Sequence, residues 1–157
     1  MKDKCKLNSL GFGVSVLLVF LLKLQQESIM QWKESSRKNR SQFILMKQWI
    51  DIKQENKKLK DFFVKNNYQH IAIYGMGDIG VALVKELENS EIEIAYGIDR
   101  NAKTIRSNIK LLSMEDNFTE VDAVIVTIIK DFDLIYEKLI KKLNCPILPI
   151  EDVINGI

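Results

Sequence analysis

The sequence predicts an α/β protein with a doubly wound, mostly parallel, five-stranded sheet, preceded by N-terminal helices that include one transmembrane helix. Three observations support this prediction. Short apolar runs alternate with helical patterns over residues 67–157, as in proteins whose helices cover a parallel sheet. A glycine-rich segment joins the first apolar run to the first helical pattern. A longer apolar segment without charges lies near the N-terminus.

The N-terminal apolar segment runs from Leu7 to Leu22 and contains no charged residue. As a helix it would span ~24 Å, somewhat less than the ~30 Å hydrocarbon core of a bilayer. Lys6 and Lys23 flank it, and their long side chains can extend towards the lipid headgroups. Because no small-residue cleavage site follows, we predict an uncleaved anchor over residues 1–24. A buried or oligomerising helix is the alternative.

A basic helical linker is predicted over residues 25–66. Its segment 33–41 (KESSRKNRS) is polar enough to form an exposed hinge next to the membrane. Two amphipathic helices, at 41–52 and 57–65, are expected to pack against the sheet or against another subunit. The basic residues that follow the anchor favour a cytoplasmic location for the bulk of the chain.

A short strand, a glycine turn and a helix follow one another between residues 71 and 87. The turn is Gly75-Met76-Gly77-Asp78-Ile79-Gly80, which matches G-x-G-x-x-G. A second apolar run, residues 92–98, ends at Asp99. This order of strand, glycine turn, helix, strand and acid is that of a Rossmann-type dinucleotide-binding unit.

Each glycine of the turn has a predicted physical role. Gly75 permits the tight turn, Gly77 lets a pyrophosphate approach the backbone, and Gly80 allows close contact between helix and strand. Amides at the helix start would hold phosphate, and Asp99 would bind ribose hydroxyls. Asp78 places a carboxylate at the same helix start, where it compensates the helix dipole but repels a phosphate.

The candidate ligand site extends to the residues that follow the other strands, because ligands of such sheets bind outside the carboxyl ends of the strands. Arg100 stands where a second nucleotide phosphate would be recognised, so NAD and NADP both remain open. Thr127 ends a strongly apolar run. The predicted cofactor-binding residues are Gly75, Met76, Gly77, Asp78, Ile79, Gly80, Asp99, Arg100 and Thr127.

The rest of the chain completes the predicted sheet. Its expected elements are a polar loop over 100–108, a weak strand at 109–112, a capped helical turn at 113–116, a buried strand over 123–129, a helix capped by Asp131, an edge strand over 146–150 and a last helical turn at 151–154.

Charge and side-chain inventory narrow the function. Residues 1–66 carry 14 Lys and Arg against 6 Asp and Glu, and residues 67–157 carry 9 against 15. An acidic globular part argues against nucleic acid as the main partner. No Tyr-x-x-x-Lys pair, metal-ligand cluster or Ser/His/Asp set is found, so no metal is expected and the catalytic residues are unknown.

The segment from Trp49 to Arg100 resembles small bacterial Rossmann-fold proteins that are described as NAD(P)-binding or nucleoside-diphosphate-sugar epimerase-like. The similarity covers about residues 43–155, with the family's glycine motif at Gly75, Gly77 and Gly80 and its YGID segment at residues 96–99. It implies a role in surface-polysaccharide biosynthesis at the bacterial cell membrane, as a single-pass protein. The missing Tyr/Lys pair departs from the epimerase pattern.

Three functions follow from these features. The first is a membrane-tethered module that binds NAD(P) or a nucleotide-sugar and serves a glycan-synthesis enzyme. The second is a ligand-free Rossmann scaffold that acts through protein contacts, including contacts in a homo-oligomer. The third is an oxidoreductase or epimerase subunit whose catalytic residues come from a partner chain.

Overall fold

The computed structural model describes the backbone of residues 2–157 and the side chains of residues 17–157. The chain divides into two compact units, Met1–Arg40 and Ser41–Ile157. Among the described residues, no helix is both long and apolar enough to cross a membrane. Residues 1–16 of the predicted anchor (1–24) lie outside the described side chains.

Helix α1 (Lys2–Gln54) is continuous, so the predicted hinge at 33–41 is helical. The physical reason is that no glycine or proline interrupts the sequence between Gly13 and Gly75. Beyond the last helical residue, Gln54, Asn56 has a left-handed φ of 58°. There the amides of Asn56 and Lys57 donate to the carbonyls of Lys53 and Ile52, both at 3.1 Å, which is a Schellman cap.

The predicted amphipathic helix at 41–52 forms the last part of α1. Its buried side chains are Leu45, Trp49 and Ile52, whereas Phe43 and Ile50 are exposed. The predicted helix at 57–65 forms as α2 (Leu59–Lys65), which buries Leu59 and Phe63 in the same core.

The sheet contains five strands in the order β3-β2-β1-β4-β5, and every neighbouring pair is parallel. Its strands are β1 (His70–Tyr74), β2 (Glu93–Ile98), β3 (Leu111–Leu112), β4 (Ala123–Val126) and β5 (Ile147–Pro149). The predicted five-stranded parallel α/β architecture is therefore confirmed. The strand order reverses between β1 and β4, so the carboxyl ends of these two strands form the switch point of the sheet.

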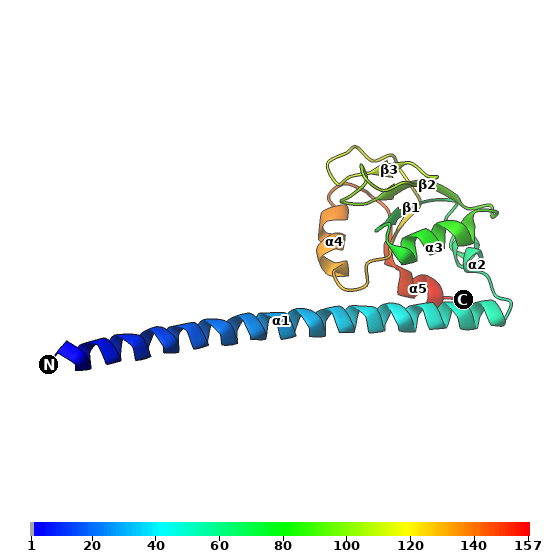
Figure 1. Cartoon of the computed structure of the whole chain (residues 1–157). Coiled ribbons are helices and arrows are strands. Elements are labelled where there is room, and N and C mark those ends of the chain that lie inside the picture. The colour runs from blue at the N-terminus through cyan, green and yellow to red at the C-terminus, as the bar shows by residue number, and fades with distance from the viewer. Residues whose placement is uncertain (1) are drawn as a thin grey trace. The chain divides into compact units, whose positions relative to one another are not determined.

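Helices cover both faces of the sheet. Figure 1 shows α3 (Asp78–Leu87) and α4 (Phe132–Leu139) on opposite sides of the strands. The α3 face also receives α2, α5 (Ile150–Asn155) and the last part of α1, and it shares one apolar cluster with them. The α4 face has its own cluster, which includes Tyr96, Ile135 and Leu139. Two separate cores, one on each face, make the β1 and β4 strands wholly buried at their centres.

Two local predictions on the α4 side were wrong. Residues 113–116 form a turn, although the Asp116 carboxylate accepts the Ser113 amide at 2.6 Å as in a capping box. The Lys142 ammonium donates to the carbonyl oxygen of Met114, which takes that carbonyl away from a helical hydrogen bond. Asp131 stands at the start of α4 but makes no side-chain cap hydrogen bond.

Candidate functional site

The glycine turn between β1 and α3 lies at the switch point of the sheet. Gly75 has a φ of +96°, which glycine adopts without strain. Its amide donates to the Ile98 carbonyl at 2.8 Å, so the turn is tied to the end of β2. A Cβ on Gly80 would lie 2.1 Å from the Gly75 carbonyl oxygen. Gly80 therefore lets α3 approach β1 more closely than any other residue would.

Gly77 faces open space at the start of α3. A Cβ built on this residue meets no atom within 4 Å, and its φ of −78° is allowed for every residue. Gly77 is the N-cap of α3 and supplies no side-chain cap, so the first amides of the helix have no acceptor within the helix. These amides and the helix dipole present positive potential to the open space, and the first-turn acid Asp78 opposes it.

Asp99 links the glycine turn to the loop that follows β2. One carboxylate oxygen accepts the Met76 amide at 2.8 Å, and the other accepts the Asn101 amide at 2.8 Å. Each oxygen of an ionised carboxylate has a second lone pair. Asp99 can therefore hold the turn and still accept hydrogen bonds from ribose hydroxyls.

Thr127 lies at the end of β4, beside the turn. Its buried hydroxyl is within 2.6 Å of the Gly75 carbonyl oxygen and 3.1 Å of the Tyr74 carbonyl oxygen, and it donates to this pair. The Thr127 hydroxyl thus fixes the turn to the end of β4, and its predicted contact with a ligand remains a prediction.

Arg100 is exposed in the loop after β2. The pKa of Tyr74 is raised, mainly because its hydroxyl is buried. The charge of Arg100 opposes this increase, and the charge of Asp99 adds to it.

Met76 and Ile79 are part of the predicted site, but their side chains are buried in the α3-side core. Met76 lies over Gly97 of β2, where an added Cβ would stand 2.8 Å from the Met76 sulfur. The glycine within the second strand is the sequence signal for this packing, and the sequence prediction did not use it.

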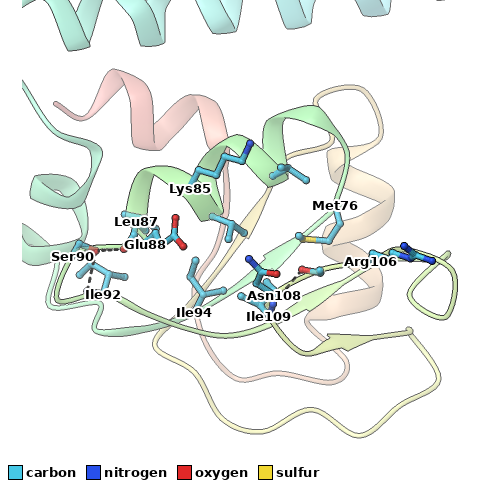
Figure 2. Close-up of a pocket in the computed structure, with 13 residues that line it drawn as sticks. Met76, Lys85, Leu87, Glu88, Ser90, Ile92, Ile94, Arg106, Asn108 and Ile109 are labelled. Atoms are coloured by element: carbon cyan, nitrogen blue, oxygen red, sulfur yellow. Dashed lines mark hydrogen bonds between the residues drawn. The ribbon is translucent and has the colours of Figure 1, made fainter.

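A groove that the sequence prediction missed lies between α3 and the loop that precedes β3. Its volume is about 440 Å³. Figure 2 shows Met76 and Arg106 at one end and Leu87, Glu88 and Ser90 at the other. Ile92, Ile94 and Ile109 form an apolar floor. The remaining residues that line the groove are Val81, Val84, Lys85, Ser107 and Asn108.

The groove arises because the β2–β3 connection contains turns but no helix. In a doubly wound sheet a helix of this connection would lie beside α3 on the same face. The polarity of residues 100–108 was the available sequence signal, and the loop predicted there is confirmed, although Ala102, Ile105 and Ile109 stand at helical spacing.

Within the described part of the chain, no group of three or more His, Cys, Asp and Glu residues is placed to hold a metal ion. His70 begins β1 at the opposite, amino edge of the sheet. Its ring nitrogen Nε2 lies 3.6 Å from a carboxylate oxygen of Glu93, and Nδ1 lies 3.7 Å from a carboxylate oxygen of Asp122. It is therefore remote from the glycine turn, at the other end of β1.

Sheet order and switch point define a parallel α/β domain, and its glycine turn is consistent with a Rossmann-like arrangement. No protein-family model matches the sequence, and no similar curated protein or solved structure was found. The resemblance to surface-polysaccharide proteins therefore stays a prediction.

Proposed function

We propose that this protein is a membrane-tethered module that binds a nucleotide, NAD(P) or a nucleotide-sugar, at the turn between β1 and α3. One observation carries the proposal: Gly77 borders open space at the start of α3, in front of amides that have no acceptor within the helix. A diphosphate fits this place because it brings negative charge and several acceptor oxygens to the backbone.

The neighbouring residues favour a nucleotide over a free phosphate. Asp99 lies at the end of β2, next to the turn, and retains lone pairs for ribose hydroxyls. Arg100 follows it on the exposed side and offers a positive charge to a further phosphate. The proposed ligand would lie across the turn with its ribose at Asp99.

The setting of the module is proposed from the sequence. The apolar residues 7–22 would hold the chain in a bacterial membrane, with the sheet in the cytoplasm. A glycan-synthesis enzyme would be the partner that uses the bound nucleotide. Fractionation without detergent tests the tether, since recovery of the intact chain in the soluble fraction would disprove it.

Isothermal titration of the purified full chain tests nucleotide binding directly. NADH, NADPH and UDP-glucose are the probes, and at least one is expected to bind and to raise the melting temperature. Absence of both heat and a melting shift with all three, and with other common nucleotide-sugars, would refute the proposal.

Gly77→Ala separates binding from folding. The new methyl group meets no atom of the protein, so unfolding free energy should change by no more than about 1 kcal/mol. The same methyl group stands where the diphosphate would approach, so affinity should fall at least tenfold. Equal affinity of Gly77→Ala and the wild type would place the ligand elsewhere.

Asp78→Asn is the complementary variant, because it removes the negative charge at the start of α3. Relief of repulsion should tighten binding of a phosphate ligand two- to fivefold, from an interaction of about 0.3 to 1 kcal/mol. Weaker binding in Asp78→Asn would instead show that the carboxylate contacts the ligand.

A further inference from the structure

Helix α1 carries a row of exposed apolar side chains at heptad spacing. In the unit Ser41–Ile157 the row comprises Phe43, Met46 and Ile50, all exposed. The same alternation of four- and three-residue steps continues through the sequence towards the N-terminus. We call this set the heptad stripe; its members are Leu18, Leu22, Gln25, Ile29, Trp32, Ser36, Asn39, Phe43, Met46 and Ile50.

We propose that the heptad stripe pairs α1 with α1 of a second copy of this chain in a parallel coiled coil. A mean spacing of 3.5 residues keeps a seam in contact with a partner helix that carries the same spacing. A second copy has this spacing by necessity. The polar members of the stripe, such as Asn39, are the kind that select one register at a cost in stability.

Exposure of the stripe shows that one copy of the chain leaves it uncovered. Among the apolar members of the stripe, the exposed fraction ranges from 36% at Met46 to 72% at Trp32. Leu45, Trp49 and Ile52, which cover the protein's own core, lie roughly a third of a turn away around the helix. The heptad stripe and the core-facing side chains thus lie on separate faces of α1. A second helix can pack on the stripe while Leu45, Trp49 and Ile52 stay in the protein's own core.

Much of α1 lacks tertiary packing within one chain. All side chains from Leu17 to Ser41 are exposed, and residues 34–41 contain three serines and an asparagine, which are poor helix formers. Helices in water gain most of their stability from packing of an apolar face. Pairing along the stripe would supply that packing.

The charges beside the stripe decide the direction of pairing. On one flank stand Lys33, Arg40 and Lys47, of which Lys47 pairs with Asp51 of the same helix at 2.9 Å. On the other flank stand the uncharged Ser28, Ser35 and Gln42. In an antiparallel pair the basic flanks of the two copies would face each other. In a parallel pair each basic flank faces the uncharged flank of the partner, so like charges stay apart.

The area of the stripe is sufficient for a specific contact. Its two aromatic residues and three aliphatic residues beyond the predicted anchor would bury on the order of 500 Å² per copy. Residues 18 and 22, where the stripe overlaps the anchor, add to this contact.

Cysteine cross-linking of the full chain tests the pairing. In a background of Cys5→Ser and Cys145→Ser, the variants Ser36→Cys and Asn39→Cys place a thiol on the stripe, and Ser35→Cys places one beside it. Mild oxidation should convert the stripe variants to a species of twice the chain mass, several-fold faster than Ser35→Cys. Equal rates for Ser35→Cys and Ser36→Cys, or no cross-link in either, would overturn the proposal.

The parallel arrangement of the two α1 helices is tested with Gln25→Cys in the same background. A parallel, in-register pair cross-links at residue 25 as well as at residue 36. An antiparallel pair brings equal residues together only near one point, so cross-linking at one of these positions alone would refute the parallel arrangement. A cross-linked species of any mass other than twice the chain would refute the second copy as partner.

Sedimentation equilibrium in detergent supplies an independent measurement. Phe43→Glu introduces a charge on the stripe and should raise the dimer dissociation constant at least tenfold. The matched control is Ile44→Glu. Ile44 is also an exposed apolar residue, at 48%, but it is not a member of the stripe. Both residues are exposed, so both variants should fold. A monomeric wild type, or equal weakening by the two variants, would contradict the proposal.

Discussion

The two connections on the α3 face of the sheet join parallel neighbours in different ways. Between β1 and β2 the chain forms α3, which buries Ile79, Leu83 and Leu87 against the sheet. Between β2 and β3 it forms turns, and a groove of about 440 Å³ is left beside α3. One connection is built into the core, whereas the other only borders it.

This difference shows how a tightly packed part and an uncovered part can arise side by side on one face of a sheet. The first connection is determined by close contact, since Gly80 and the Gly75 carbonyl oxygen leave no room for a side chain. The second connection supplies polar and charged groups at the same sheet edge without filling the face. Asp99 joins the two, because its carboxylate accepts amides from the turn and from the following loop.

The largest expected effect comes from Gly80→Ala, which breaks the first connection. The methyl group would stand 2.1 Å from a backbone oxygen, so α3 must move away from β1. Chemical denaturation should show a loss of at least about 3 kcal/mol. Gly77→Ala is the control, since its methyl group is unobstructed. Similar losses in the two variants would mean that the contact at Gly80 does not hold the helix.

The same comparison can be made with side chains. Leu83→Ala removes a fully buried side chain from α3 and should cost about 3 kcal/mol. Ile109→Ala removes a half-buried one from the second connection and should cost about 1 kcal/mol. Urea titration of both variants measures the contrast, and a larger loss at Ile109 would show that the second connection is part of the central core.

Strand β2 belongs to both connections, and Tyr96 anchors its other face. Burial raises the pKa of Tyr96 to about 12, and its hydroxyl donates to the Thr119 carbonyl at 2.7 Å. The neutral phenol therefore stabilises the fold fully below about pH 10, and this contribution disappears as the pH rises towards 12.

The expected alkaline loss is about 2 to 3 kcal/mol. Unfolding free energy measured between neutral pH and high pH should fall more steeply for the wild type than for Tyr96→Phe, which keeps the ring and removes the ionisable group. Identical pH dependence of the two proteins would show that Tyr96 does not titrate with unfolding.

A smaller effect than at Gly80 or Tyr96 is expected from Asp99→Asn, which loosens the link between the two connections. An amide has one oxygen and accepts only one of the two backbone amides well, so stability should fall by about 1 to 2 kcal/mol. Hydrogen exchange should speed up at Met76 or Asn101. Unchanged exchange at both amides would show that the carboxylate does not hold the turn.

Local sequence determined the architecture of the sheet and the position of the turn. Apolar runs ending at polar residues predict strands, and Gly75, Gly77 and Gly80 predict a turn followed by a helix, because these are properties of neighbouring residues. The end of α1 is also local, since Asn56 adopts the left-handed conformation that a helix cap needs.

Only the tertiary structure decided which of the apolar side chains that look alike in the sequence are buried and which are exposed. α1 has two apolar faces, and the sequence contains no signal that Leu45, Trp49 and Ile52 would be buried while Phe43 is exposed. Thr127 and Met76 were predicted as ligand contacts; only the tertiary structure shows that the Thr127 hydroxyl donates to the Gly75 carbonyl and that the Met76 side chain packs in the core. The groove has the same origin, because an empty place on a sheet depends on every segment that fails to cover it.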